Sequence, residues 1–186
     1  MRGVLQVLSD WNHPVAIVTK GALIERDLDI LTDMAARRLV SVGVSVTTLD
    51  PGLSRRLEPR APVPSRRLAA IRALSGAGVP VRVMVAPVIP VLTDHELEAI
   101  LEAAAGAGAC AASWILLRLP HEVAPLFRDW LARNEPGKAA HVMSRLREMR
   151  GGKDYDAEWG KRMRGEGLHA RLIAHRFTIA ARRLGL

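Results

Sequence analysis

Polar side chains recur at the ends of four short apolar segments of this sequence. If these segments are parallel strands, their C-terminal ends meet at one edge of a sheet, which is where such folds bind ligands. We therefore expect a ligand site at that edge. The polar residues at these ends are Lys20, Ser45, Thr47, Thr48, Asp50, Thr93, Asp94, Arg118 and His121.

The third of these ends is the stretch VAPVIPVLTDHE, residues 85–96, in which two prolines follow an apolar run. Pro87 and Pro90 lack N–H groups, so backbone polar groups are left unpaired by the sheet and are free to bond a flat polar ligand edge. A proline-stiffened turn between a strand and a helix is the alternative interpretation.

Several familiar chemistries are excluded. No G-x-S-x-G, P-loop or G-x-G-x-x-G pattern occurs. The six histidines are scattered without metal-ligand spacing, and Cys110 is the one cysteine. We expect Cys110 to be a small buried residue at the start of a strand. The sequence therefore predicts no catalytic residue and no metal ligand within this chain.

Strands and helices alternate along most of the chain. Because the strands are apolar at nearly all positions, they are typical of parallel strands covered on both faces. The predicted fold class is therefore α/β. The expected strands are 14–20, 39–46, 79–87 and 112–120, and the helices that follow them are about 25–38, 63–77, 94–107 and 121–133.

Local signals place the ends of these helices. Thr93 and Glu96 form a T-x-x-E pattern, which predicts a capping box at the start of a helix. Glycines at 76–78 and 106–109 predict two helix C-termini. The long loop after the second strand, TTLDPGLSRRLEPRAPVPS, carries Arg55, Arg56, Glu58 and Arg60, and long loops in compact domains are often functional.

Composition indicates a chain with one hydrophobic core. Of the 186 residues, 49% are hydrophobic, yet no apolar run approaches the roughly 20 residues that span a bilayer. The N-terminus shows no small-residue cleavage site, so we expect a cytoplasmic protein without membrane contact. We expect a barrel-like portion at 1–134 and a helical, basic extension at 135–186.

The formal net charge of +8 would suit an anionic partner such as nucleic acid. The densest basic tract is 161–186, with seven Lys or Arg residues and one Glu. Its helix at 168–184 has an apolar face and a basic face, and a solvated surface explains the basic face equally well. The apolar face contains Ile173, Phe177, Ala180 and Leu184, and the opposite face contains Arg171, His175 and Arg182.

Several motifs together resemble radical S-adenosylmethionine (SAM) proteins. They are VTK, VSVTTLD with LEPRAP, VMVAPVIPVLTDHELE, LLRLPHEV and MRGGK. The combination is similar to the group related to spore photoproduct lyase, often labelled DNA repair photolyases. The resemblance implies a partial (β/α)6 barrel, and it implies a [4Fe-4S] cluster that reduces SAM to a 5′-deoxyadenosyl radical.

The resemblance also implies roles for individual residues. The lysine that ends the third barrel strand of the family corresponds to Lys20, and the serine on the fourth strand corresponds to Ser45. These positions approach the methionyl part and the ribose of SAM. The Ala-Pro after the fifth strand corresponds to Ala86 and Pro87, whose backbone lies near the adenine.

The family's G-x-I-x-G-x-x-E pattern is only partly kept. Ile89 matches, Asp94 is a shortened acid, and Val91 stands where close relatives have glycine. A β-branched residue does not readily adopt a positive φ, so we expect a distorted loop. Arg60 and Arg118 are the expected contacts to a substrate carboxylate or phosphate.

The main departure is the absence of a C-x3-C-x-x-C motif. The resemblance places Met1 near the end of the helix before the third barrel strand, and it implies the C-terminal part of a radical SAM protein, inactive alone. A partial gene product, a degenerate homologue and a mis-started reading frame all fit this expectation. Such a barrel would leave the 14–20 strand as an edge, which favours poor solubility or edge-to-edge dimerisation.

Two functional hypotheses remain open. The first is a radical SAM lyase-like enzyme, represented here without its cluster-binding part. The second is a non-catalytic α/β interaction or nucleic-acid-binding protein that uses the basic C-terminal tract. Iron binding would favour the first hypothesis, and a steep salt dependence of DNA binding would favour the second.

Overall fold

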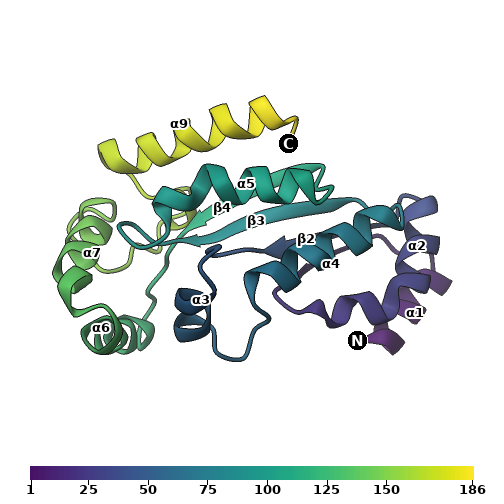
Figure 1. The fold of residues 1–186 in the computed structure, drawn as a ribbon, viewed down its shortest axis with the longest axis horizontal. Helices are drawn as coiled ribbons and strands as arrows, with labels where there is room; N and C mark the ends of the chain where they lie inside the picture. Colours follow the sequence, from purple (N-terminus) through teal and green to yellow (C-terminus); the bar gives the residue numbers. More distant parts are fainter.

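The computed structural model describes residues 1–186, and its centre is one sheet of four parallel strands (Figure 1). The strands are β1 (Val15–Thr19), β2 (Val40–Ser45), β3 (Val81–Val88) and β4 (Ala111–Leu116). They lie in chain order across the sheet, with β1 and β4 at its edges. All four predicted strands are confirmed; the first three differ by one or two residues at their ends, and the fourth ends at Leu116, four residues before its predicted end.

Helices connect the strands and cover one face of the sheet. They are α1 (Arg2–Asp10), α2 (Leu28–Ala36), α3 (Pro51–Leu57), α4 (Pro64–Gly76), α5 (Leu97–Gly106), α6 (Val123–Asn134), α7 (Pro136–Glu148), α8 (Lys161–Arg164) and α9 (Gly167–Leu184), with 3-10 turns at Ala22–Asp27 and Asp94–Glu96. Helices α2, α4 and α5 pack on the same face, and α9 lies along α5 (Figure 1). The predicted α/β class, a partial β/α barrel, is confirmed.

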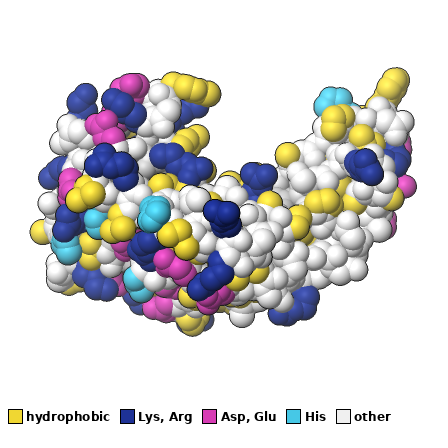
Figure 2. All heavy atoms as spheres, turned by 90° about the horizontal axis from the view of Figure 1, so that it is seen from above, with side chains coloured by type: hydrophobic (Ala, Val, Ile, Leu, Met, Phe, Trp, Pro, Cys, Tyr) yellow, Lys and Arg dark blue, Asp and Glu magenta, His cyan; other side chains and the backbone are white.

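The sheet is covered on one face only, so the prediction of two covered faces is wrong. Val42, Val44 and Val83 point into the core beneath the helices and are fully buried. Their neighbours Ser41 and Arg82 point to the opposite face and are exposed. Burial alternates along β1 and in the first part of β3 because this second face lines an open surface, whereas in β2 only Ser41 is exposed. The molecule as a whole is a crescent with one hollowed side (Figure 2).

The predicted capping box at Thr93 and Glu96 is wrong. The Thr93 hydroxyl accepts a hydrogen bond from the Ile89 amide at 2.9 Å, and the Glu96 carboxylate accepts from the Thr48 hydroxyl and the Leu49 amide, both at 2.6 Å. Glu96 therefore joins the chain after β3 to the loop after β2, whereas Thr93 bonds the backbone of its own corner. These contacts replace the capping box.

The predicted glycine helix ends are confirmed. Helix α4 ends at Gly76 and α5 at Gly106, and each is followed by a glycine with positive φ, Gly78 at 80° and Gly108 at 99°. A side chain at Gly108 would also lie within 2.4 Å of the Ser75 hydroxyl. Glycine is therefore required where α4 and α5 end side by side.

Helix α3 lies inside the segment that the sequence predicts to be a long loop. Asp50 caps it, because its carboxylate accepts from the amides of Gly52 at 2.7 Å and Leu53 at 3.1 Å, and Pro51 takes the first helical position. The D-P start signal is present in the sequence, but a helix of seven residues is too short to show a periodic apolar face.

Helix α9 docks by the predicted face. Ile173 and Ala180 are buried, and Phe177 and Leu184 pack against the same core. The predicted basic face, Arg171, His175 and Arg182, is exposed. None of the helices is both long and apolar enough to cross a membrane.

Candidate functional site

The C-terminal ends of all four strands border one cavity of about 340 Å³. The strands are parallel and adjacent, so their ends meet at one edge of the sheet, as the sequence predicts. The cavity combines cationic, hydroxyl and apolar groups, which suits a ligand with both polar and flat apolar parts. Its lining residues are Val18, Lys20, Ser45, Met84, Ala86, Pro87, Ile115, Leu116, Leu117 and Arg118.

Five of the eight predicted site residues therefore lie together: Lys20, Ser45, Ala86, Pro87 and Arg118. They come from four strands that are separated along the chain by helices. Their placement at one cavity is a property of the fold, and their binding roles stay predictions.

The other three predicted residues lie elsewhere. Ile89 is 1% exposed and packs in a second apolar cluster with residues of α6 and α7. Asp94 begins the 3-10 turn before α5. Arg60 is exposed, makes no side-chain hydrogen bond or ion pair, and does not line the cavity.

An ion-pair network connects the cavity to the protein interior, with the Lys20 side chain 41% exposed and the Arg67 side chain 1% exposed. Lys20 Nζ donates to Glu58 Oε1, and Arg67 Nη2 donates to Glu58 Oε2 at 2.5 Å. Arg67 is 2% exposed and also donates to the carbonyls of Ser45 at 3.1 Å and Pro62 at 2.8 Å. One carboxylate therefore orients the lysine that the sequence assigns to the site.

Thr47 connects this network to the corner after β3. Its hydroxyl lies 3.2 Å from Glu58 Oε1 and 3.2 Å from the Ala86 carbonyl. A hydroxyl donates one proton, so it donates to one of these oxygens at a time. Glu58 thus positions Lys20, and Arg67 positions the Ser45 backbone. Thr47 links the same network to the Ala86 backbone.

Glu58 is ionised at neutral pH in this arrangement. Burial raises the pKa of its carboxyl group, but hydrogen bonds from Lys20 and Arg67, with their positive charges, outweigh burial and hold the pKa below its usual value. Sequence reasoning named Glu58 only as part of the long loop and missed Arg67. One feature of the sequence could have indicated Glu58: it is the only acid between Arg55 and Arg60, in the loop that follows β2.

The corner after β3 is held by its own side chains. Val91 has a φ of 71°, so it adopts the left-handed conformation despite its β-branched side chain. Asp94 Oδ1 accepts from the Val91 amide at 2.8 Å, and Thr93 accepts from the Ile89 amide. The sequence predicts a distorted loop here, but the structure keeps Val91 in the left-handed region, where Asp94 stabilises its backbone.

The cavity continues onto the uncovered face of the sheet. A second hollow of about 290 Å³ shares Val18 and Met84 with it and extends past Arg82 and Ser113. Gly43 lies between these residues, and a side chain there would approach Met84 Sδ to 3.0 Å. The uncovered face therefore offers a continuous, mostly apolar groove beside the polar strand ends.

No group of side chains in this chain suits an iron–sulfur cluster. The structure brings together no set of three or more His, Cys, Asp or Glu side chains that could bind a metal ion. Cys110 lies just before β4, at the opposite edge from the cavity, and is exposed, so the prediction that it is buried is wrong. It ends a tight glycine turn, where its thiol lies 3.4 Å from the Val81 carbonyl.

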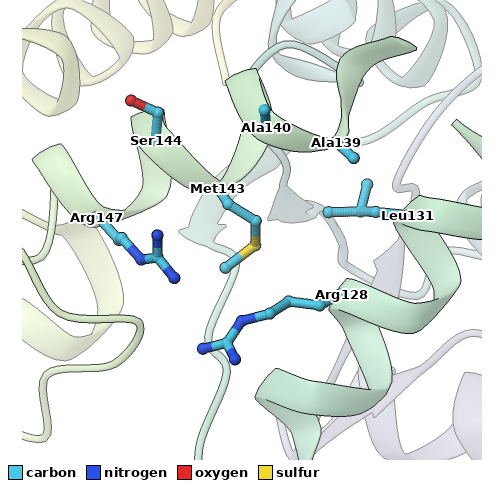
Figure 3. Close-up of a pocket in the computed structure, with 7 residues that line it drawn as sticks. All are labelled: Arg128, Leu131, Ala139, Ala140, Met143, Ser144 and Arg147. Atoms are coloured by element: carbon cyan, nitrogen blue, oxygen red, sulfur yellow. The ribbon is translucent and has the colours of Figure 1, made fainter. Parts of the chain in front are cut away.

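Another cavity, of about 470 Å³, lies between α6 and α7. Figure 3 shows Arg128 and Arg147 reaching toward one another beside Met143. Both arginines pair with Asp154, so each has an acidic partner within the protein. No predicted site residue lines this cavity, and it contains no acid or nucleophile arranged for catalysis.

Comparison with known proteins identifies the family. Residues 3–104 match the Radical SAM superfamily, which covers more than half of the chain. An uncharacterized protein of Mycobacterium tuberculosis is 40% identical over 151 residues, which are 80% of this chain and 43% of that protein. The chain belongs to the radical SAM superfamily.

More distant relatives are also uncharacterized. A protein of Acidianus two-tailed virus is 38% identical over 74 residues, 40% of this chain and 24% of that protein. A protein of Methanocaldococcus jannaschii is 28% identical over 87 residues, 47% of this chain and 32% of that protein. The chain spans less than half the length of the curated relatives it matches.

The superfamily implies SAM and a [4Fe-4S] cluster as cofactors. The cavity at the strand ends fits SAM, because its lining combines the cation of Lys20 with apolar groups that include Pro87 and Ile115. The chain does not fit the cluster, because a cluster of this type needs three cysteine thiolates and Cys110 is the sole cysteine.

Proposed function

We propose that this chain supplies the SAM-binding surface of a radical SAM protein of the spore photoproduct lyase-like group, often labelled DNA repair photolyases. One observation carries the proposal: Lys20, Ser45, Ala86 and Pro87, each assigned to SAM by sequence resemblance, line the same cavity of about 340 Å³. The relatives that cover most of the chain are uncharacterized and do not test the subgroup.

Each residue then has a physical task. Lys20 is the cation for the carboxylate of the methionyl part, and Glu58 orients it without being part of the cavity lining. The Ser45 hydroxyl forms a hydrogen bond with the ribose. The backbone of Ala86 and Pro87 borders the adenine, with Ile115 as an apolar wall. Because Thr47 and Arg67 fix the backbone at Ala86 and Ser45, these groups are arranged before the ligand arrives.

When bound, a [4Fe-4S] cluster supplies the electron for reductive cleavage of SAM in this superfamily. We propose that its ligands come from outside these 186 residues and that the chain alone is inactive. The single cysteine supports this proposal, as does the 43% coverage of the mycobacterial relative. The role of the present residues is to bind and orient SAM.

A titration of the chain with SAM tests the proposal. We expect saturable 1:1 binding by calorimetry, and about tenfold weaker binding in Lys20→Ala, because a charge-assisted hydrogen bond is lost. Lys138→Ala is the matched control, since Lys138 lies in α7 and pairs with Glu135 away from the cavity. No saturable binding, or equal losses in both variants, would contradict the proposal.

A further inference from the structure

Arg118 lies at the β4 end of the cavity and has only neutral partners. Its Nη2 donates to the Tyr155 hydroxyl at 2.9 Å, and its Nη1 lies 3.7 Å from Met163 Sδ. The Tyr155 ring also lies under the guanidinium, 5.6 Å from its centre. Arg118 Nε is buried and has no acceptor at all. Part of its hydrogen-bonding capacity is therefore unused.

A second arginine fixes the backbone beside Arg118. Arg150 is 1% exposed, and its guanidinium donates at 2.9 Å to the carbonyls of Leu117, Lys161 and Arg162. Its Nε also lacks an acceptor. Arg150 thus joins the end of β4 to the segment before α9, which places Arg118 at the cavity.

These two arginines carry an uncompensated positive charge. Burial lowers the pKa of Arg150 first, and the neighbouring Arg118 charge lowers it further, while Asp156 and Tyr155 act in the opposite direction. Asp156 forms no ion pair with either arginine, and no other carboxylate lies within ion-pair distance of them. Buried charges in proteins are normally paired, so this region lacks an anion.

The other cations near the two cavities have acidic partners. Lys20 and Arg67 share the Glu58 carboxylate, and both arginines of the cavity between α6 and α7 pair with Asp154. Arg118 is thus the cation of the strand-end cavity that lacks an acidic partner. A low-dielectric, concave wall focuses its field toward the ligand.

We propose that Arg118 binds a phosphate group of the substrate, beside the SAM site. The inference rests on the proposed function for the neighbouring ligand. A guanidinium offers paired donors that match phosphate oxygens, and exchanging a phenol and a thioether for an anion strengthens its hydrogen bonds. The substrate class is therefore a phosphate ester whose anionic group enters at the β4 end of the cavity.

The test uses inorganic phosphate as the probe, measured by equilibrium dialysis of the labelled ion at constant ionic strength. We expect saturable binding at one site and a loss of about tenfold or more in Arg118→Gln. Arg72→Gln is the control, since Arg72 of α4 is exposed and does not line the cavity. Absence of saturable phosphate binding, or an equal loss in Arg72→Gln, would overturn the proposal.

The variant Tyr155→Phe distinguishes an effect on phosphate binding from an effect on folding. The variant keeps the ring under Arg118 but removes the hydroxyl that occupies Nη2, so we expect phosphate affinity to stay equal or to rise. Weaker binding in Tyr155→Phe with an unchanged melting temperature would contradict a phosphate site on Arg118.

SAM titrations show whether the anionic group that Arg118 binds belongs to a separate substrate or to SAM itself. If the anion belongs to a separate substrate, Arg118→Gln keeps SAM affinity within about twofold and loses phosphate binding. If Arg118→Gln loses SAM binding and retains phosphate binding, the arginine contacts the SAM carboxylate and the inference is wrong. If the wild-type chain binds phosphate but not SAM, the proposed function is contradicted and the phosphate site at Arg118 is not.

Discussion

Glu58 accepts hydrogen bonds from Lys20 and Arg67, and Thr47 joins the same carboxylate to the corner at Ala86. Lys20 and Ala86 could be predicted, because each lies at the end of an apolar strand. Glu58 and Arg67 could not, because they come from the end of α3 and from α4, and only the fold brings them to the strand ends.

At this residue scale, Glu58→Gln is expected to lower the free energy of unfolding by about 1–3 kcal/mol at pH 7, because Arg67 stays buried without a charged partner. The folded-state pKa of Glu58 lies below its ordinary value of 4.5. The carboxylate's contribution is therefore complete above that value and is lost as pH falls through the folded-state pKa. Urea unfolding from pH 7 down to pH 3 measures the difference.

Glu102→Gln is the control for this prediction. Glu102 of α5 pairs with Arg183, and both side chains are more than half exposed, so its loss changes the free energy of unfolding little. A difference between wild type and Glu58→Gln that stays constant over the whole pH range would show that the Glu58 charge does not stabilise the fold.

At the scale of the elements, strands and glycine helix ends could be predicted because their signals are local. The capping box prediction failed because Glu96 bonds the distant Thr48, and Thr93 bonds the Ile89 amide that precedes it in the same corner. The second face of the sheet was wrongly predicted to be covered. Ser41, Gly43 and Ser45 do mark that face in β2, but the strand is too short for the alternation to stand out.

The corner between β3 and α5 gives the second prediction. Asp94→Ala removes the acceptor of the Val91 amide, so we expect the free energy of unfolding to fall by about 1–2 kcal/mol, whereas Asp94→Asn keeps an oxygen and loses less. Chemical denaturation measures both. Equal losses in the two variants would mean that the nearby His169, and not the Val91 amide, is the partner that matters.

At the scale of the whole molecule, β1 forms an edge of the sheet, and Val18 on it is 63% exposed. We propose edge-to-edge association through this strand, as expected from the sequence. Sedimentation of the wild-type chain is expected to show dimers at high concentration, and Val18→Lys is expected to be a monomer. A wild-type monomer at every concentration would count against the proposal.

Nucleic-acid binding through residues 161–186 stays a prediction. Arg176 and Arg183 pair with Glu98 and Glu102 of α5, which leaves Arg171 and Arg182 as exposed cations of α9 without acidic partners. If DNA binds there, its affinity falls steeply with salt, and Arg171→Gln with Arg182→Gln lowers both affinity and the salt slope. Arg183→Gln is the control, and an equal effect in the control would argue against a specific basic face.

The division into a barrel portion at 1–134 and an extension at 135–186 also stays a prediction. Ile173 and Ala180 of α9 belong to the same apolar core as the sheet strands. A truncation that ends at residue 134 would expose that part of the core.

The measurement that tests the central claim most directly is amide chemical-shift mapping of the 20.3 kDa chain during a titration with SAM. The account predicts that the shifted amides cluster at Lys20, Ser45, Ala86 and Ile115, at the strand ends. Shifts confined to the cavity between α6 and α7, or no shifts at all, would contradict it.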